Sequence, residues 1–322
     1  MAMSAPENAP RPGLPALKFG IIIPVGPSAN DVERAGDVLA SVLAYEPETP
    51  LVLFIDDGGK DRRLDEKFRA TATCRLVNIF NTRNGHGIGE TSGLSAGMLL
   101  AIAWLHANAD CGFVMKLDTD ALIIAPFAEK ILRTLAARPD VGMVGLYNRM
   151  CDGSVRDQTS FRKMLGKLAS PFAVWRNPPG WGYLTVHLWG RGATIRRQIT
   201  EAIRAGYRPA EFILGGAYAF TGEAVRRFAK HGFLDDPHLW LGTHFSEDVV
   251  LSMYVCATGL RLHGMTADGE PFAVQHYGLP DTPERLVERG YSVIHSVKSD
   301  ARFSEAAIRE FYRKRREAQA AK

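Results

Sequence analysis

Short apolar runs alternate along the first half of the chain with longer segments in which apolar residues recur every three or four positions. The first run, residues 18–25, is followed by Gly26 and Pro27, which is typical of a buried parallel strand that leads into a turn. Between Asp31 and Pro47 the apolar positions have helical spacing and form one stripe. The pattern therefore predicts a strand followed by an amphipathic helix.

The same alternation continues to about Leu146. It predicts strands at residues 51–55, 76–80, 113–117 and 141–146, and helices at residues 94–105 and 128–137. Strands that alternate with helices imply a mostly parallel sheet with helices on its faces. We therefore expect an α/β fold with a central, mainly parallel sheet flanked by helices.

The pattern loosens after Tyr147 and returns near Ile213. The second half is predicted to contain strands at residues 217–220 and 271–276, and helices at residues 223–230, 246–257 and 305–316. The region between the halves is aromatic and basic: residues 151–210 hold ten Lys or Arg and three Asp or Glu. Its rings are Trp175, Trp181, Tyr183 and Trp189.

Composition adds a few limits. The apolar content of 46% over 322 residues is enough for a large core, and no apolar stretch reaches the roughly 20 residues that a membrane-spanning helix needs. The four cysteines form no C-x-x-C pair, so neither a zinc site nor a disulfide framework is indicated. The N-terminus lacks a secretion pattern, so we expect a cytoplasmic protein.

Two aspartates carry the strongest chemical signal. Asp118 and Asp120 directly follow the strand predicted at residues 113–117, and residues two apart on a strand face the same way. Their carboxylates could converge on a divalent ion. Earlier strands end at Pro24 and at Asp56, and the carboxyl ends of parallel strands share one edge of the sheet, where ligands bind.

Six segments in this order resemble glycosyltransferases of the GT-A fold, in particular those of family 2, across about residues 18–276. The matching segments are Ile23-Pro24-Val25, the run from Asp56-Asp57-Gly58 to Asp61, Asn84-Gly85-His86-Gly87, Asp118-Thr119-Asp120, Gly215-Gly216 and Glu247-Asp248. The resemblance implies one GT-A domain at residues 18–300, with a nucleotide-sugar donor half at 18–147 and an acceptor half at 148–300. Residues 1–17 are expected to be a disordered lead, and residues 301–322 a basic C-terminal helix.

The resemblance also implies roles for individual residues. Asp56 or Asp57 would contact the base and ribose of the nucleotide, while Asp118 and Asp120 would hold Mg²⁺ or Mn²⁺ at the diphosphate. A histidine ligand would favour Mn²⁺; His276 is the expected one and His295 its rival. The full expected set on the donor side is Pro24, Val25, Asp56, Asp57, Asn84, Asp118, Gly215 and Gly216.

Asp248 is the expected general base, because inverting transfer needs a carboxylate that takes the proton of the acceptor hydroxyl. Glu247 would then orient the acceptor. The alternative for both residues is structural: Ser246 can cap a helix, and acidic residues are favoured in a first helical turn.

These residues predict metal-dependent, inverting transfer of a hexose from a nucleotide diphosphate sugar, expected to be a UDP-sugar, to a hydroxyl of a glycan or glycolipid-like acceptor. The basic, aromatic region would suit an anionic acceptor, or it is a packing layer with solvated charges. No nucleic-acid partner is expected. The basic tail is a solvated helix face or, less simply, a peripheral membrane contact. A sugar-phosphate nucleotidyltransferase and a non-catalytic carbohydrate- or nucleotide-binding module are the alternatives.

Overall fold

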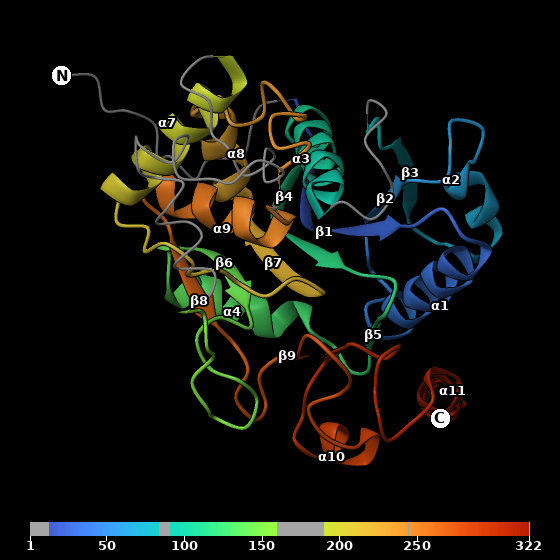
Figure 1. Ribbon diagram of the computed structural model, residues 1–322. Helices are drawn as coiled ribbons and strands as arrows, with labels where there is room; N and C mark the ends of the chain where they lie inside the picture. Colours follow the sequence, from blue (N-terminus) through green and yellow to red (C-terminus); the bar gives the residue numbers. More distant parts are fainter. Residues whose placement is uncertain (1–12, 84–90, 160–189, 244, 322) are drawn as a thin grey trace.

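The computed structural model describes residues 13–83, 91–159, 190–243 and 245–321 (Figure 1). A seven-stranded sheet in the order β3-β2-β1-β4-β7-β6-β8 lies at the centre. Its strands are β1 (Ala16–Val25), β2 (Leu51–Asp56), β3 (Arg75–Phe80), β4 (Asp110–Leu117), β6 (Val141–Gly145), β7 (Ala217–Thr221) and β8 (Arg261–Gly264). Neighbouring strands are parallel except where β7 pairs with β4 and β6.

A second sheet of three short strands lies beside the first, in the order β5-β10-β9. Its members are β5 (Ala121–Ile123), β9 (Phe272–Val274) and β10 (Val293–His295). β5 follows β4 after only three residues, so the second sheet is attached to the central sheet at the carboxyl end of β4.

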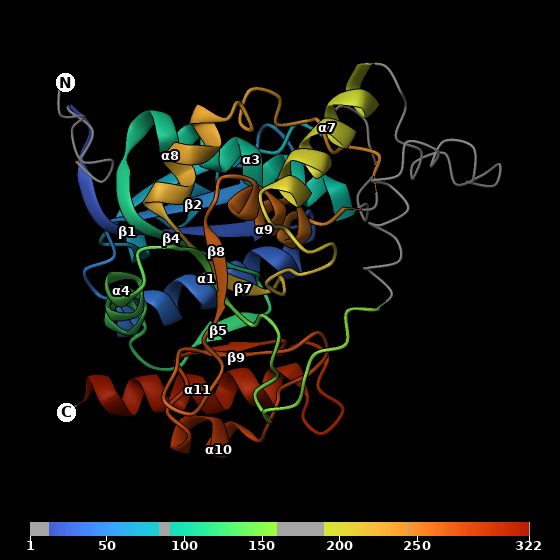
Figure 2. The same cartoon turned by 90° about the vertical axis from the view of Figure 1, so that its left-hand side faces the viewer.

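The helices cover both faces of the central sheet, as Figure 2 shows. α3 (Thr91–Asn108), α7 (Gly190–Arg204), α8 (Gly222–Lys230) and α9 (Glu247–Ala257) pack on one face. α1 (Ala29–Tyr45) and α4 (Ala128–Ala137) pack on the other. α10 (Pro283–Glu288) and α11 (Glu305–Ala320) cover the second sheet, and short α2 (Leu64–Lys67) and a 3-10 turn (Arg69–Thr71) precede β3.

The beginning of α1 is fixed by a capping box. The Ser28 hydroxyl accepts from the Asp31 amide at 3.1 Å, and the Asp31 carboxylate accepts from the Ser28 amide at 3.2 Å. Each contact satisfies a backbone donor that the first helical turn leaves free. Val32 and Leu39 on the expected apolar stripe are buried against the sheet.

The predicted α/β class is confirmed, and so are the strands and helices that the sequence pattern predicts in the described residues. The pattern missed α2, β5, α7, β8, α10 and β10. Most of these are too short for a periodic signal. The expected late strand at residues 271–276 ends earlier, at Val274.

Across the part of the chain that the structure describes, no helix has both the length and the apolar character needed to cross a membrane. The expected disordered lead falls mostly on residues 1–12, outside the described residues.

Candidate functional site

Asp118, Thr119 and Asp120 form the connection between β4 and β5, called here the aspartate loop. Its backbone is held from several sides. The Asp118 amide donates to Gly216 O at 2.7 Å, and the Asp118 carbonyl accepts from the Ala121 amide at 3.0 Å. The Asp120 carbonyl accepts from the Val297 amide at 2.9 Å. The loop is therefore fixed by β7, by β5 and by the segment after β10.

The side chains of Asp118, Asp120 and His295 converge beside this loop. One oxygen or nitrogen atom from each lies within 4.8 Å of the other two. Asp120 and His295 are buried, and Asp118 is partly exposed. Two carboxylates and one imidazole form a donor set that could hold a divalent cation.

His295 has the ring orientation of a metal ligand. Its Nδ1 atom donates to the Gln275 carbonyl oxygen at 2.9 Å, because that oxygen can only accept. Its Nε2 atom lies on the side of Asp120, 3.3 Å from Oδ1. A backbone acceptor on the far nitrogen is the usual way in which proteins orient a histidine toward a metal.

His276, the histidine expected from the sequence, is not in this group. It is exposed and packs edge-on against Tyr277, with ring centroids 4.3 Å apart. β9 ends at Val274, and the next residue, Gln275, uses its amide and carbonyl on His295. His295, and not His276, is therefore the histidine that lies beside the two aspartates.

Asp120 is surrounded by cationic and hydroxyl groups. Its Oδ2 atom accepts from Ser296 Oγ at 2.7 Å and lies 3.0 Å from Lys298 Nζ. Burial opposes ionisation of Asp120, but the hydrogen bond and charge of His295, together with Lys298, outweigh burial and hold the pKa of Asp120 well below its usual value. The carboxylate is thus ionised and available to a cation.

Lys116 joins the aspartate loop to α9. Its side chain is fully buried, and Nζ lies 2.6 Å from Asp118 Oδ1 and 3.0 Å from Glu247 Oε1. Burial disfavours the charged amine, yet the two carboxylates outweigh that effect and raise the pKa of Lys116. A buried ammonium group therefore lies between Asp118 of the aspartate loop and Glu247 of α9.

Glu247 and Asp248 stand in the first turn of α9 and are both buried. Burial raises the pKa of Glu247 to about 7, although Lys116 acts in the opposite direction. Asp248 accepts three hydrogen bonds: from the Val249 amide at 2.8 Å, from the Gly215 amide at 2.8 Å and from Ser246 Oγ. Ser246 makes no side-chain cap on the helix. Helix capping by Ser246 therefore does not account for the acidic pair.

Gly215 and Gly216 connect this pair to the aspartate loop. Gly216 has φ of +79°, and a Cβ atom there would stand 2.5 Å from His295 Nδ1. A Cβ atom on Gly215 would stand 3.2 Å from Asp248 Oδ2. Only glycine combines the backbone conformation of Gly216 with such a close approach, which explains the glycine at that position.

The expected donor residues at the ends of β1 and β2 lie at one sheet edge, because Val25 pairs with Asp56. The two aspartates of this edge are paired with arginines. Arg62 Nε donates to Asp56 Oδ1 at 2.7 Å, and Arg83 Nε donates to Asp57 Oδ1 at 2.9 Å. Asp56 is fully buried, so the more accessible groups here are the partly exposed arginines.

Arg62 also donates to Gly26 O at 2.8 Å and so fastens the turn after β1 to the turn after β2. Sequence reasoning did not find either arginine, nor Lys116, Ser296 and Lys298. Of these, Lys116 and Ser296 are close in the sequence to Asp118 and His295, and only this closeness could have indicated them. Asn84 and the rings Trp175, Trp181, Tyr183 and Trp189 lie outside the described residues.

No protein-family model and no curated protein sequence matches this chain. Among solved structures, the chain is similar to the galactosyltransferase LgtC in complex with donor and acceptor sugar analogs, at 13% identity and a TM-score of 0.40, over 76% of this chain and 72% of that chain. It is similar to mouse xyloside xylosyltransferase 1 at 12% identity and a TM-score of 0.41, over 77% of this chain and 84% of that chain.

A third similar structure is the Mn/GDP form of core-mannan synthase A from Aspergillus fumigatus, at 11% identity and a TM-score of 0.41, over 77% of this chain and 72% of that chain. At such identities and TM-scores the likeness says nothing of activity. The function proposed for this chain rests on its own residues.

Proposed function

We propose that this protein is a metal-dependent glycosyltransferase that moves a hexose from a nucleotide diphosphate sugar, specifically a UDP-sugar, to a hydroxyl of a glycan or glycolipid-like acceptor, with inversion. One observation carries the proposal: a group of Asp118, Asp120 and His295 within 4.8 Å stands next to a buried acidic pair. Lys116 and the two glycines connect these parts. A cation site that offsets leaving-group charge, beside a carboxylate that can accept a proton, suits this reaction.

Asp118, Asp120 and His295 would hold Mn²⁺ or Mg²⁺. When bound, such an ion offsets the negative charge that develops on a departing nucleoside diphosphate. Lys298 supports the same task, because its side chain is about half exposed and its ammonium group lies 3.0 Å from Asp120. It can contact a diphosphate oxygen without leaving the site.

The acidic pair supplies the general base in this proposal. Asp248 is the base expected from the sequence, but its two oxygens accept from three donors, which leaves little room for a substrate proton. Glu247 has a pKa raised to about 7, near the value at which a base works best at neutral pH. Together these features favour Glu247 as the proton acceptor, with Asp248 fixing the Gly215 amide.

The basic C-terminal helix gives little support to membrane contact. Arg309 and Arg316 pair with Asp37 of α1, and Arg313 pairs with Glu310 and Glu317 of its own helix. Since these charges are neutralised within the protein, the proposal needs no membrane surface. The acceptor half of the site, the division near residue 147 and a cytoplasmic location remain predictions.

The decisive experiment measures release of sugar and UDP from a panel of UDP-hexoses, with Mn²⁺ and with a chelator. One donor should turn over with Mn²⁺ and not with the chelator. Asp120→Ala and His295→Ala should each lower this activity at least about 100-fold, because loss of a ligand exceeds the 10- to 100-fold cost of disturbing a ligand's support.

His276→Ala is the matched control, since that ring lies outside the group, and it should keep wild-type activity. A turnover rate that changes neither with the chelator nor with Asp120→Ala would refute metal dependence. Formation of a nucleotide sugar from UTP and a sugar 1-phosphate would identify a nucleotidyltransferase, and binding without turnover a binding module. NMR of the first-formed product decides between inversion and retention.

A further inference from the structure

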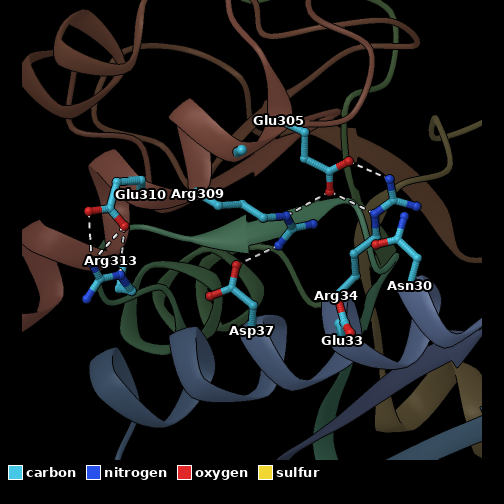
Figure 3. Close-up of a pocket in the computed structure, with 9 residues that line it drawn as sticks. Asn30, Glu33, Arg34, Asp37, Glu305, Arg309, Glu310 and Arg313 are labelled. Carbon is cyan, nitrogen blue, oxygen red and sulfur yellow. Dashed lines mark hydrogen bonds and ion pairs between the residues drawn. The ribbon is translucent and has the colours of Figure 1, made fainter.

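Outside the site, a groove lies between α1 and α11. A cavity of about 590 Å³ opens there, lined by Asp37 of α1 and by Glu305, Arg309 and Arg313 of α11. Figure 3 shows Arg309 extending between the two helices, with Asp37 on one side of its guanidinium group and Glu305 on the other. The same side chain reaches past the cavity to the aspartate loop.

Arg309 makes three separate contacts. Its Nε donates to Glu305 Oε1 at 2.8 Å, its Nη1 to Asp37 Oδ2 at 2.6 Å, and its Nη2 to the Thr119 carbonyl at 2.8 Å. Thr119 stands between Asp118 and Asp120. The guanidinium is planar and carries its donors in a fixed fork, so two carboxylates that hold one side of it also fix the direction of the third contact.

This contact completes the support of the aspartate loop. The carbonyl of Asp118 is held by Ala121 and that of Asp120 by Val297, so Arg309 supplies the partner for the carbonyl between them. We propose that Arg309 of the C-terminal helix is a positioning residue for the metal site: it holds the Thr119 carbonyl so that the carboxylates of Asp118 and Asp120 converge. The proposal deepens the function proposed above and rests on it.

The contact acts through geometry rather than through charge. Asp37 and Glu305 lie against the guanidinium and offset its positive charge, so it adds little repulsion toward a cation. Loss of Arg309 also leaves the helices joined. Asp37 keeps Arg316 at 2.6 Å, and Glu305 keeps Arg34 at 2.7 Å. A variant at Arg309 should therefore fold.

The chain provides two matched controls on the same helix. Arg316 binds Asp37 and, among the residues that the structure describes, makes no hydrogen bond to the aspartate loop, so Arg316→Gln tests helix docking alone. Arg313 lines the same cavity but pairs with Glu310 and Glu317 of its own helix, so Arg313→Gln tests loss of a surface arginine. Arg309→Gln removes the bond to Thr119 and the positive charge while keeping a polar side chain, and the two controls remove the same charge elsewhere on the helix.

The first measurement is the dissociation constant for Mn²⁺ alone, from titration calorimetry on the full chain. Arg309→Gln should weaken Mn²⁺ at least about tenfold, the usual cost of disturbing the support of a metal ligand. Arg316→Gln and Arg313→Gln should bind as the wild type does. Equal Mn²⁺ affinity in Arg309→Gln, or an equal loss in Arg316→Gln, would overturn the proposal.

The second measurement is amide hydrogen exchange without metal, which keeps the proposal testable even if the wild type binds no Mn²⁺. The Asp118 and Ala121 amides are hydrogen-bonded in the loop. They should exchange faster in Arg309→Gln than in the wild type, and at the wild-type rate in both controls. Unchanged exchange at these amides in Arg309→Gln would refute positioning. A wild type that binds no Mn²⁺ even with UDP present would refute the metal site of the proposed function instead, and exchange alone would then decide whether Arg309 holds the loop.

Discussion

Gly216 lies between the aspartate loop and His295. Its carbonyl accepts from the Asp118 amide, and a Cβ atom on it would stand 2.5 Å from His295 Nδ1. Gly216→Ala should lower the free energy of unfolding by about 1–2 kcal/mol for the left-handed backbone, and by about 1–3 kcal/mol more for the contact with the ring. Urea unfolding measures the sum, and Mn²⁺ affinity should fall as His295 is displaced.

Gly153 is the matched control for this substitution. It has φ of +82° and nothing within 4 Å of a Cβ atom, so Gly153→Ala carries the backbone cost alone. The difference between the two variants isolates the close approach to His295. Equal destabilisation of the two proteins, with unchanged Mn²⁺ affinity, would show that Gly216 does not shape the site.

Glu247 provides a prediction on pH. A base must be unprotonated to act, and the pKa of Glu247 is raised to about 7, so kcat should rise with pH up to about 7 and then level off. Glu247→Gln should abolish turnover while leaving UDP binding unchanged. Asp248→Asn should lower turnover but keep the rise near pH 7.

The reverse result would restore the assignment made from the sequence. If Asp248→Asn eliminates turnover and Glu247→Gln retains both activity and the rise near pH 7, then Asp248 is the base. In that case the three hydrogen bonds to Asp248 must rearrange when the acceptor binds.

At the scale of elements, the sequence predicts most of what builds the central sheet. β1, β2 and β4 are continuous apolar runs because both of their faces are covered, and α1 shows its buried stripe directly. Long periodic segments of this kind carry their own signal. The ends of these strands therefore indicated Asp56, Asp118 and Asp120 correctly as residues of one sheet edge.

The second sheet could not be predicted in the same way. β5, β9 and β10 have three residues each, which is too short for a pattern of alternating burial. Their place is decided by pairing with each other, and pairing of β10 with both neighbours is what carries His295 to Asp120. The same limit explains why the sequence favoured His276, although His295 is the histidine that lies beside the two aspartates. The roles of Arg309 and Lys116 depend on contacts with segments that are distant in the sequence, Thr119 for Arg309 and Glu247 for Lys116. Residue spacing along the chain does not predict such contacts.

At the scale of the whole molecule, the site joins segments that are far apart in the sequence: the end of β4, the glycines before β7, the start of α9 and the end of β10. Beside the aspartate loop the charges are nearly balanced without substrate, since Lys116 pairs with Asp118 and Lys298 with Asp120. A diphosphate that enters beside this loop meets these two carboxylates as well as the two ammonium groups. Tight binding of the diphosphate therefore needs one more positive charge.

This balance predicts strong coupling between metal and nucleotide. Saturating Mn²⁺ should raise the affinity for UDP by roughly 5- to 150-fold, and saturating UDP should raise the affinity for Mn²⁺ by the same factor, because coupling free energies are reciprocal. Calorimetric titrations of each ligand with and without the other measure both factors. Asp120→Ala should lose the coupling, whereas His276→Ala, which changes an exposed ring outside the group, should retain it. If UDP binds equally well in the presence of a chelator, Lys116 and Lys298 alone neutralise the diphosphate, and the cation has no part in donor binding.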